Sequence, residues 1–250
     1  MLYKMSHSYN YKFQPKDERD YIYKKSDIEI PVVYNITNSS IIESPILDQG
    51  QLGSCVANAA SSLFYILSNG RIKLSRLQLY FCCRGIDRSK FDEDTGTYVR
   101  TALKSAGSYG LTNEAFWKYN IYKFDILPPS KSFRPVYNLK NYTYTNVPQD
   151  LESFKNCLSL GNPIIFGFLV YSSFENVSDN GIIPMPNIEK ETLLGGHSML
   201  IIGFDDDKKY FKIQNSYGSN WGDKGYGYFP YEYMLDRELT GDIWTVHFTN

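Results

Sequence analysis

The chain has 250 residues, and its 26 lysine and arginine residues nearly balance its 27 aspartate and glutamate residues. This balance argues against a protein that binds nucleic acid mainly through charge. Hydrophobic residues make up 42% of the chain and charged residues 21%, which excludes a disordered chain and indicates an ordered globular protein with a substantial core.

Residues 1–29 are polar, charged and rich in tyrosine, and they show neither helical nor strand periodicity. We interpret this stretch as an N-terminal arm, either flexible or ordered. Its first residues lack the apolar segment of a signal peptide, so we expect an intracellular or otherwise reducing compartment, with a lysosome-like compartment or a particle as alternatives. The longest apolar run, residues 163–171, is too short for a membrane span.

The first predicted helix follows the loop DQGQLGS and begins at Cys55. It is rich in alanine and leucine and apolar on most faces, which predicts a buried helix. Ser54 is the predicted N-cap, and Asn69-Gly70 is the predicted stop. Two further helices are expected near residues 75–84 and 98–105.

The second half of the chain predicts one more helix, at residues 149–160, and then mostly strands. The strand-like segments are separated by turns rich in glycine or aspartate, and they are residues 163–170, 197–205, 209–216, 225–230 and 243–248. The outline is therefore an α+β protein with a helical N-terminal half and a β-rich C-terminal half.

Cys55 is a candidate nucleophile because free backbone N–H groups and the helix dipole favour a thiolate at the first turn of a helix. The alternative is a small buried core residue. A nucleophilic thiol usually needs a base. Of the three histidines, His7 lies in the arm and His247 in the last strand, whereas His197 follows two glycines and begins an apolar strand. His197 is therefore the candidate base, and the other three cysteines are predicted to be free thiols.

A hairpin provides a possible partner for this histidine. If residues 197–216 fold about Asp206, residue 197 lies opposite Asn215, whose side-chain carbonyl can accept a hydrogen bond from an imidazole N–H. A bulge would shift this pairing by one residue, and Asn215 alone would be interpreted as a turn residue. The acidic run at the turn predicts solvated carboxylates and no calcium site. Gln49, six residues before Cys55, is a candidate for stabilising a tetrahedral oxyanion.

Three segments resemble the signature blocks of papain-like cysteine peptidases, the cathepsin group, in order and in spacing. They are DQGQLGSC (48–55), GGHSMLIIGF (195–204) and IQNSYGSNWGDKGYGYF (213–229). The resemblance implies a papain-like two-lobed α+β fold over residues 30–250, with the active-site cleft between the lobes. The helical lobe would span about residues 50–145 and the β-barrel-like lobe about residues 146–250, and residues 1–29 would be an arm or a minimal prosegment.

The resemblance also implies a role for each site residue. Cys55 would be the nucleophile, and His197 would be its base and later its acid. Asn215 would hold the imidazole, Gln49 would help to form the oxyanion hole, and Trp221 would cover the His–Asn edge.

For substrate binding, the resemblance implies that Gly96 forms one edge of the cleft and that Gly196 and Ser198 touch the substrate. The base of the main specificity pocket would fall within residues 235–242, where an acidic residue would admit basic side chains. Three acidic residues compete for that place: Asp236, Glu238 and Asp242.

The sequence departs from the family pattern at three places. Val56 replaces an aromatic residue, Tyr217 replaces a tryptophan that covers the site, and Leu52 replaces a disulfide-forming cysteine. We expect a monomer that acts on peptide or protein substrates, with no nucleic acid, cofactor or metal. The alternatives are a non-hydrolytic binding protein on this fold and another thiol acyl-transfer enzyme, such as an amidase or transglutaminase.

Overall fold

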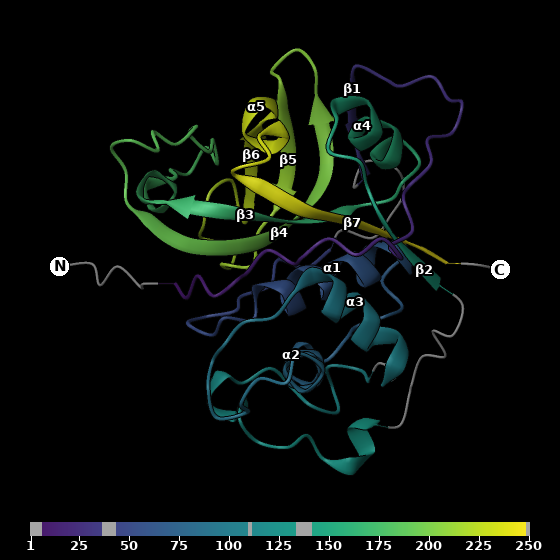
Figure 1. Cartoon of the computed structure of the whole chain (residues 1–250), viewed down its shortest axis with the longest axis vertical. Helices are drawn as coiled ribbons and strands as arrows, with labels where there is room; N and C mark the ends of the chain where they lie inside the picture. The colour runs from purple at the N-terminus through teal and green to yellow at the C-terminus, as the bar shows by residue number, and fades with distance from the viewer. Residues whose placement is uncertain (1–6, 37–43, 110–111, 134–141, 249–250) are drawn as a thin grey trace.

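The computed structural model describes residues 7–36, 44–109, 112–133 and 142–248. Helices α1, α2 and α3 gather on one side of the molecule, and the strands form a sheet on the other side (Figure 1). The N-terminal arm runs between these two parts as an extended segment (Figure 1). This is the two-lobed α+β architecture that the sequence predicts.

The helical lobe is built around α1, which is buried along nearly its whole length and contacts both other long helices and strand β4. Asn69 and Gly70 follow it with positive φ angles of 52° and 74°, as expected for a helix stop. The helices are α1 (Cys55–Leu67), α2 (Arg76–Ile86), α3 (Val99–Ser108), η2 (Ile121–Lys123), η3 (Ser130–Phe133), α4 (Leu151–Ser159), η4 (Ser172–Asn176) and α5 (Tyr231–Leu235).

The capping prediction for α1 was wrong in its chemistry. Ser54 occupies the N-cap position, but its side chain makes no capping hydrogen bond. Its hydroxyl instead lies 2.5 Å from the Tyr119 hydroxyl and accepts from the Asn58 amide. The Ser54 hydroxyl therefore bonds to other side chains and not to a backbone N–H of the first helical turn. At α2 the capping bond does form, because the Ser75 side chain accepts from the Gln78 N–H.

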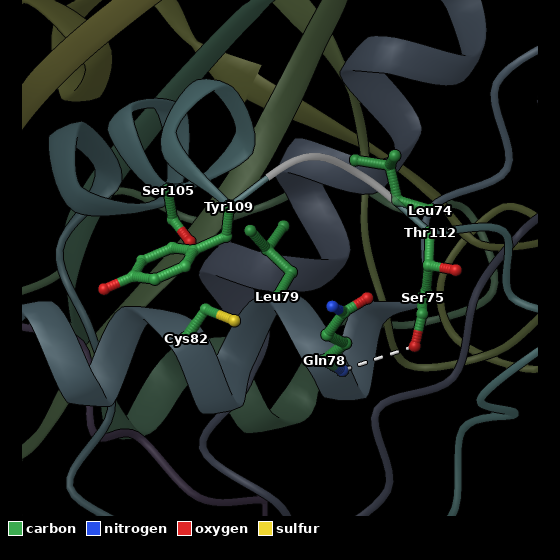
Figure 2. Close-up of a pocket in the computed structure, with 8 residues that line it drawn as sticks. All are labelled: Leu74, Ser75, Gln78, Leu79, Cys82, Ser105, Tyr109 and Thr112. Atoms are coloured by element: carbon green, nitrogen blue, oxygen red, sulfur yellow. Dashed lines mark hydrogen bonds between the residues drawn. The ribbon is translucent and has the colours of Figure 1, made fainter. Parts of the chain in front are cut away.

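A small pocket lies between α2 and α3 in the helical lobe (Figure 2). Its volume is about 10 Å³, enough for a single water molecule at most. It contains none of the predicted site residues, and its lining is Leu74, Ser75, Gln78, Leu79, Cys82, Ser105, Tyr109 and Thr112.

All strand pairs of the sheet are antiparallel, in the order β2-β7-β3-β4-β5-β6, with β1 paired to β4. The central strands β3 and β4 are almost entirely buried, which explains their continuous apolar runs. The strands are β1 (Val33–Asn35), β2 (Tyr142–Asn146), β3 (Ile164–Tyr171), β4 (Leu193–Asp205), β5 (Tyr210–Gln214), β6 (Tyr226–Pro230) and β7 (Thr240–Phe248). Among the described residues, no helix is both long and apolar enough to cross a membrane.

The predicted register of the β4–β5 hairpin was wrong. Leu200 lies opposite Gln214, because the turn is centred between Asp207 and Lys208 and not on Asp206. The bulge between Ile201 and Gly203 moves the pairing back by only one residue. Extending this register places the position two residues beyond His197 opposite Asn215. Both positions share one face of the sheet, so His197 and Asn215 meet diagonally and not as a direct pair.

Residues 7–29 of the N-terminal arm are ordered. It forms a parallel bridge between Asn10 and Gly196 of β4 and a second one between Ile22 and Asn146 of β2. The arm is therefore held at both ends of its course along the sheet, which decides between the flexible and ordered alternatives for residues 7–29.

Candidate active site

Cys55 is the first residue of α1, and its side chain is fully buried. Burial raises the pKa of the thiol to about 12, and the nearby negative charge of Asp94 acts in the same direction. The backbone N–H groups of Ser198 and Val56 lie beside the sulfur and oppose this shift by favouring the thiolate. With the arm docked, Cys55 is therefore a neutral thiol in a site already equipped to stabilise its anion.

His197 lies on β4, beside the Ser198 N–H that reaches the Cys55 sulfur. Its Nε2 lies 2.8 Å from Asn215 Oδ1, and its Nδ1 is buried with no hydrogen-bond partner among the described residues. Since Asn215 Oδ1 also accepts the Ser216 N–H, this oxygen is an acceptor, and Nε2 carries the imidazole proton. The unpaired Nδ1 is therefore the atom free to take a proton.

The pKa of His197 is lowered from 6.5 to about 3. Burial is the main cause; the Asn215 hydrogen bond raises the pKa, and the charge of His7 lowers it. The imidazole is therefore neutral in this arm-docked form.

Gln49 is fully buried and connects the loop before Cys55 to the strand end that carries Asn215. Its Nε2 donates to the Leu52 carbonyl over 3.0 Å, and its Oε1 accepts from the Ser216 hydroxyl over 2.6 Å. An amide NH₂ group has two hydrogens, so one donor remains for a further acceptor.

An aromatic wall surrounds the His197 ring. Tyr217 stacks on it with ring centroids 4.7 Å apart, and Phe168 and Phe174 meet it at 5.8 Å and 6.2 Å. Trp221 packs against Tyr217 and Phe174 and therefore forms the layer behind them. Sequence reasoning missed both phenylalanines. Phe168 lies in the buried apolar run of β3, which carries no signal for which ring faces His197, and Phe174 lies in η4, whose packing against β4 is a tertiary contact.

Two of the residues expected to bind substrate lie directly against the arm. Gly196 donates its N–H to the Tyr9 carbonyl and accepts the Tyr11 N–H, both over 3.1 Å. At Gly96, a Cβ atom would lie 2.2 Å from the Asn10 carbonyl oxygen, so only glycine allows this approach. The Ser198 hydroxyl is buried and donates to the Phe166 carbonyl within the sheet, and the contact of this residue with substrate stays a prediction.

The arm also covers the catalytic candidates. The His7 ring stacks on Tyr217 with centroids 3.6 Å apart, and Tyr9 meets His197 edge-on at 6.4 Å. The Asn10 amide donates to the Asp94 carbonyl over 2.7 Å. His197, Tyr217, Asp94 and Gly196 thus all lie against the same stretch of the arm.

The four cysteines are all buried, unpaired thiols. Within the part of the chain that the structure describes, no group of three or more histidine, cysteine, aspartate or glutamate side chains could hold a metal ion.

Comparisons with known proteins agree on one family. A family model described as papain family cysteine protease matches residues 30–235. A peptidase C1-like protein of Acanthamoeba polyphaga mimivirus is 36% identical over 218 residues, which cover 80% of this chain and 68% of the relative. A cathepsin L-like peptidase of Aedes aegypti is 24% identical over 211 residues, covering 80% of this chain. The match spans only 59% of that relative's length, and 55% of mouse procathepsin L.

Solved structures give the same result. Xylellain, a cysteine protease from Xylella fastidiosa, matches with a TM-score of 0.89 and 30% identity over 97% of this chain and 96% of that one. Digestive procathepsin L 3 of Tenebrio molitor matches with a TM-score of 0.70 over 99% of this chain and 77% of that one, and at 18% identity it shows the fold alone.

Proposed function

Because the chain belongs to the papain family of cysteine proteases, we propose that it hydrolyses peptide bonds with Cys55 as nucleophile and His197 as base. One observation carries the proposal. Asn215 holds the Nε2–H side of the imidazole, which leaves Nδ1 unpaired on the residue next to the backbone N–H that reaches the Cys55 sulfur.

The proposed reaction starts with proton transfer from the Cys55 thiol to Nδ1 of His197. The thiolate attacks the peptide carbonyl carbon, and the Cys55 N–H and the remaining Gln49 amide hydrogen stabilise the resulting oxyanion. His197 then gives its proton to the leaving amine, the C–N bond breaks, and a thioester remains. Water attacks this thioester with His197 as base, which releases the acid product and restores the thiol.

We further infer that the arm, residues 7–29, keeps the peptidase domain of residues 30–250 latent. The arm already uses the backbone groups of Gly196 that an extended peptide would need. Its departure would let water reach both catalytic side chains, which would lower the pKa of Cys55 and raise that of His197. Opening the arm would therefore also favour the reactive thiolate–imidazolium pair.

The test is to label the full chain with an epoxide inhibitor of papain-like enzymes and then to assay fluorogenic peptides. We expect the label on Cys55 and a loss of turnover of roughly 10³-fold or more in Cys55→Ala. Cys157→Ala, which removes another buried thiol, is the matched control, and it should keep both the label on Cys55 and the wild-type turnover. Labelling that survives Cys55→Ala would overturn the nucleophile assignment, and transfer of the acyl group to an amine in place of water would favour the acyl-transfer alternative.

A further inference from the structure

The loop before Cys55 is held at both ends of one peptide bond, the bond that joins Leu52 to Gly53. At one end, Gln49 Nε2 donates to the Leu52 carbonyl over 3.0 Å. At the other end, the Gly53 N–H donates to Asp94 Oδ2 over 2.8 Å. Because the carbonyl and the N–H of a peptide bond lie in one rigid plane, these two hydrogen bonds together fix the orientation of that plane.

The Asp94 carboxylate is itself held by helix α2. Its other oxygen, Oδ1, accepts the Tyr80 hydroxyl over 2.5 Å, and the same hydroxyl accepts the Gly96 N–H over 3.0 Å. The Tyr80 ring is fully buried, so it cannot move away without disturbing the packing of the helical lobe. Asp94 therefore connects the loop before the nucleophile to a helix and to the loop of Gly96.

This connection needs neither a disulfide nor the arm. All four cysteines are free thiols, so no disulfide fixes the loop. The three groups that the carboxylate connects belong to residues 30–250. The arm adds two contacts, a long hydrogen bond of 3.5 Å from the Ser8 hydroxyl to Asp94 Oδ2 and one of 2.7 Å from the Asn10 amide to the Asp94 carbonyl.

The charge of Asp94 does not explain its place beside the nucleophile. This charge raises the pKa of Cys55 and so disfavours the thiolate. A favourable effect of Asp94 on the reaction therefore has to come from its hydrogen bonds. The direct route leads through the peptide plane to Gln49. If the plane turns, the Leu52 carbonyl moves off the Gln49 amide, and the NH₂ group loses the acceptor that orients it.

We propose that Asp94 is a positioning residue of the oxyanion hole. By holding the Gly53 N–H, it keeps the Leu52 carbonyl on the Gln49 amide, and the remaining amide hydrogen then points at the substrate oxygen that becomes charged. This inference rests on the proposed peptidase function and on the role of Gln49 in it. Since the oxyanion forms only in the transition state, loss of Asp94 should affect kcat more than KM.

The test is a double-mutant cycle of Asp94 and Gln49 in the full chain, with kcat measured on a fluorogenic peptide. Gln49→Ala should lower kcat by roughly 10²- to 10³-fold, the range for one oxyanion donor. Asp94→Ala should lower it by roughly tenfold to a hundredfold, the range for a hydrogen bond to a charged group. In the Gln49→Ala background, the same change should cost less than about threefold, because the amide that Asp94 positions is absent.

The cycle separates positioning from the other effects that Asp94 could have. A loss that comes from a weaker fold, or from altered docking of the arm, would be equal in the two backgrounds. An effect of charge alone would have the opposite sign, since the Cys55 thiolate forms more easily without Asp94. Equal losses in the two backgrounds, or a gain in kcat on Asp94→Ala, would overturn the proposal.

Two further variants test the hydrogen bond itself. Asp94→Asn removes the charge but keeps an oxygen for the Gly53 N–H, so it should retain more of the wild-type kcat than Asp94→Ala. Equal kcat values for these two variants would contradict the hydrogen-bond explanation. The matched control is Asp92→Ala, which removes an exposed carboxylate of the same loop and should leave kcat unchanged. A loss there as large as that of Asp94→Ala would overturn the assignment to Asp94.

NMR spectra of full-length Cys55→Ala separate this proposal from the proposed function. Adding Asp94→Ala should shift the Gly53 amide proton upfield, because its hydrogen bond to a carboxylate is lost, and should also shift the side-chain amide protons of Gln49. Adding Asp92→Ala should shift neither. If no peptide is cleaved, the peptidase function fails, while these shifts still decide whether Asp94 orients Gln49. Unchanged Gln49 signals overturn the proposal on their own.

Discussion

At the residue scale, the site depends on which atoms of Asn215 and His197 face each other. Two donors converge on Asn215 Oδ1, the imidazole Nε2–H and the Ser216 N–H, so the amide has one orientation that satisfies both. That orientation fixes the imidazole tautomer and leaves Nδ1 for the thiol proton. Asn215 thus fixes the orientation of the His197 ring.

Removal of the hydrogen bond between Asn215 and His197 should change the pKa of His197 in a predictable direction. The Asn215 bond raises the pKa of His197, so Asn215→Ala should lower it, and the alkaline limb of the kcat/KM profile should move to lower pH. The shift should be under about one pH unit, because a single hydrogen bond contributes about 1 kcal/mol. Asn187→Ala, at an exposed position, is the control. If kcat/KM falls at every pH while the alkaline limb stays at the same pH, this explanation is contradicted.

At the element scale, the loop that carries Asp94 and Gly96 is held by a buried arginine of α2. The Arg84 guanidinium donates to the carbonyls of Phe91 and Glu93 over 2.7 Å and 3.1 Å, and also to that of Phe124. These three hydrogen bonds come from one guanidinium that is itself fully buried. The helix therefore positions this loop through a side chain, not through backbone pairing.

Arg84→Met should destabilise the fold by about 3 kcal/mol, since three hydrogen bonds from a buried charged donor are lost while the apolar volume is nearly kept. Urea unfolding of the variant measures this cost. Arg237→Met, at an exposed position, should stay within about 0.5 kcal/mol of the wild type. A cost below about 1 kcal/mol for Arg84→Met would mean that the loop holds its shape without the guanidinium.

At the scale of the whole molecule, the arm connects the two lobes and makes docking sensitive to pH. In the closed form His197 has a pKa of about 3, against 6.5 for a solvated imidazole. Between these values the closed form leaves the ring unprotonated, whereas an open form binds the proton. The stability of the closed form is thus fully present above about pH 6.5 and is lost as the pH falls below it.

Two other histidines also destabilise the closed form as the pH falls, whereas a buried carboxyl group has the opposite effect. Burial also lowers the pKa of His7, although the charges of Asp48 and Glu175 raise it, and burial lowers that of His247. Asp242 acts in the opposite direction, since burial raises its pKa above 3.8 and the closed form keeps its proton longer. Asp242 therefore affects the stability of the closed form at a more acidic pH, where carboxyl groups titrate.

Hydrogen exchange of the Tyr11 amide, corrected for the intrinsic rate, checks the pH dependence in full-length Cys55→Ala, which cannot cleave itself. Exchange should accelerate between about pH 7.5 and 5.5, because an open form takes up protons there. His197→Gln should weaken this dependence. Protection that stays constant over this range would show that docking is not linked to the imidazoles.

The sequence by itself determined the α+β outline, the helix that begins at Cys55 and the set of candidate residues that meet in the cleft. These depend on local periodicity, helix stops and short motifs, which one segment carries alone. Only the tertiary structure decided the β4–β5 register, the aromatic rings against His197 and the partner of the Ser54 hydroxyl. Each of these depends on contacts between segments far apart in the chain, as does the course of the arm through the cleft, and no local pattern encodes them.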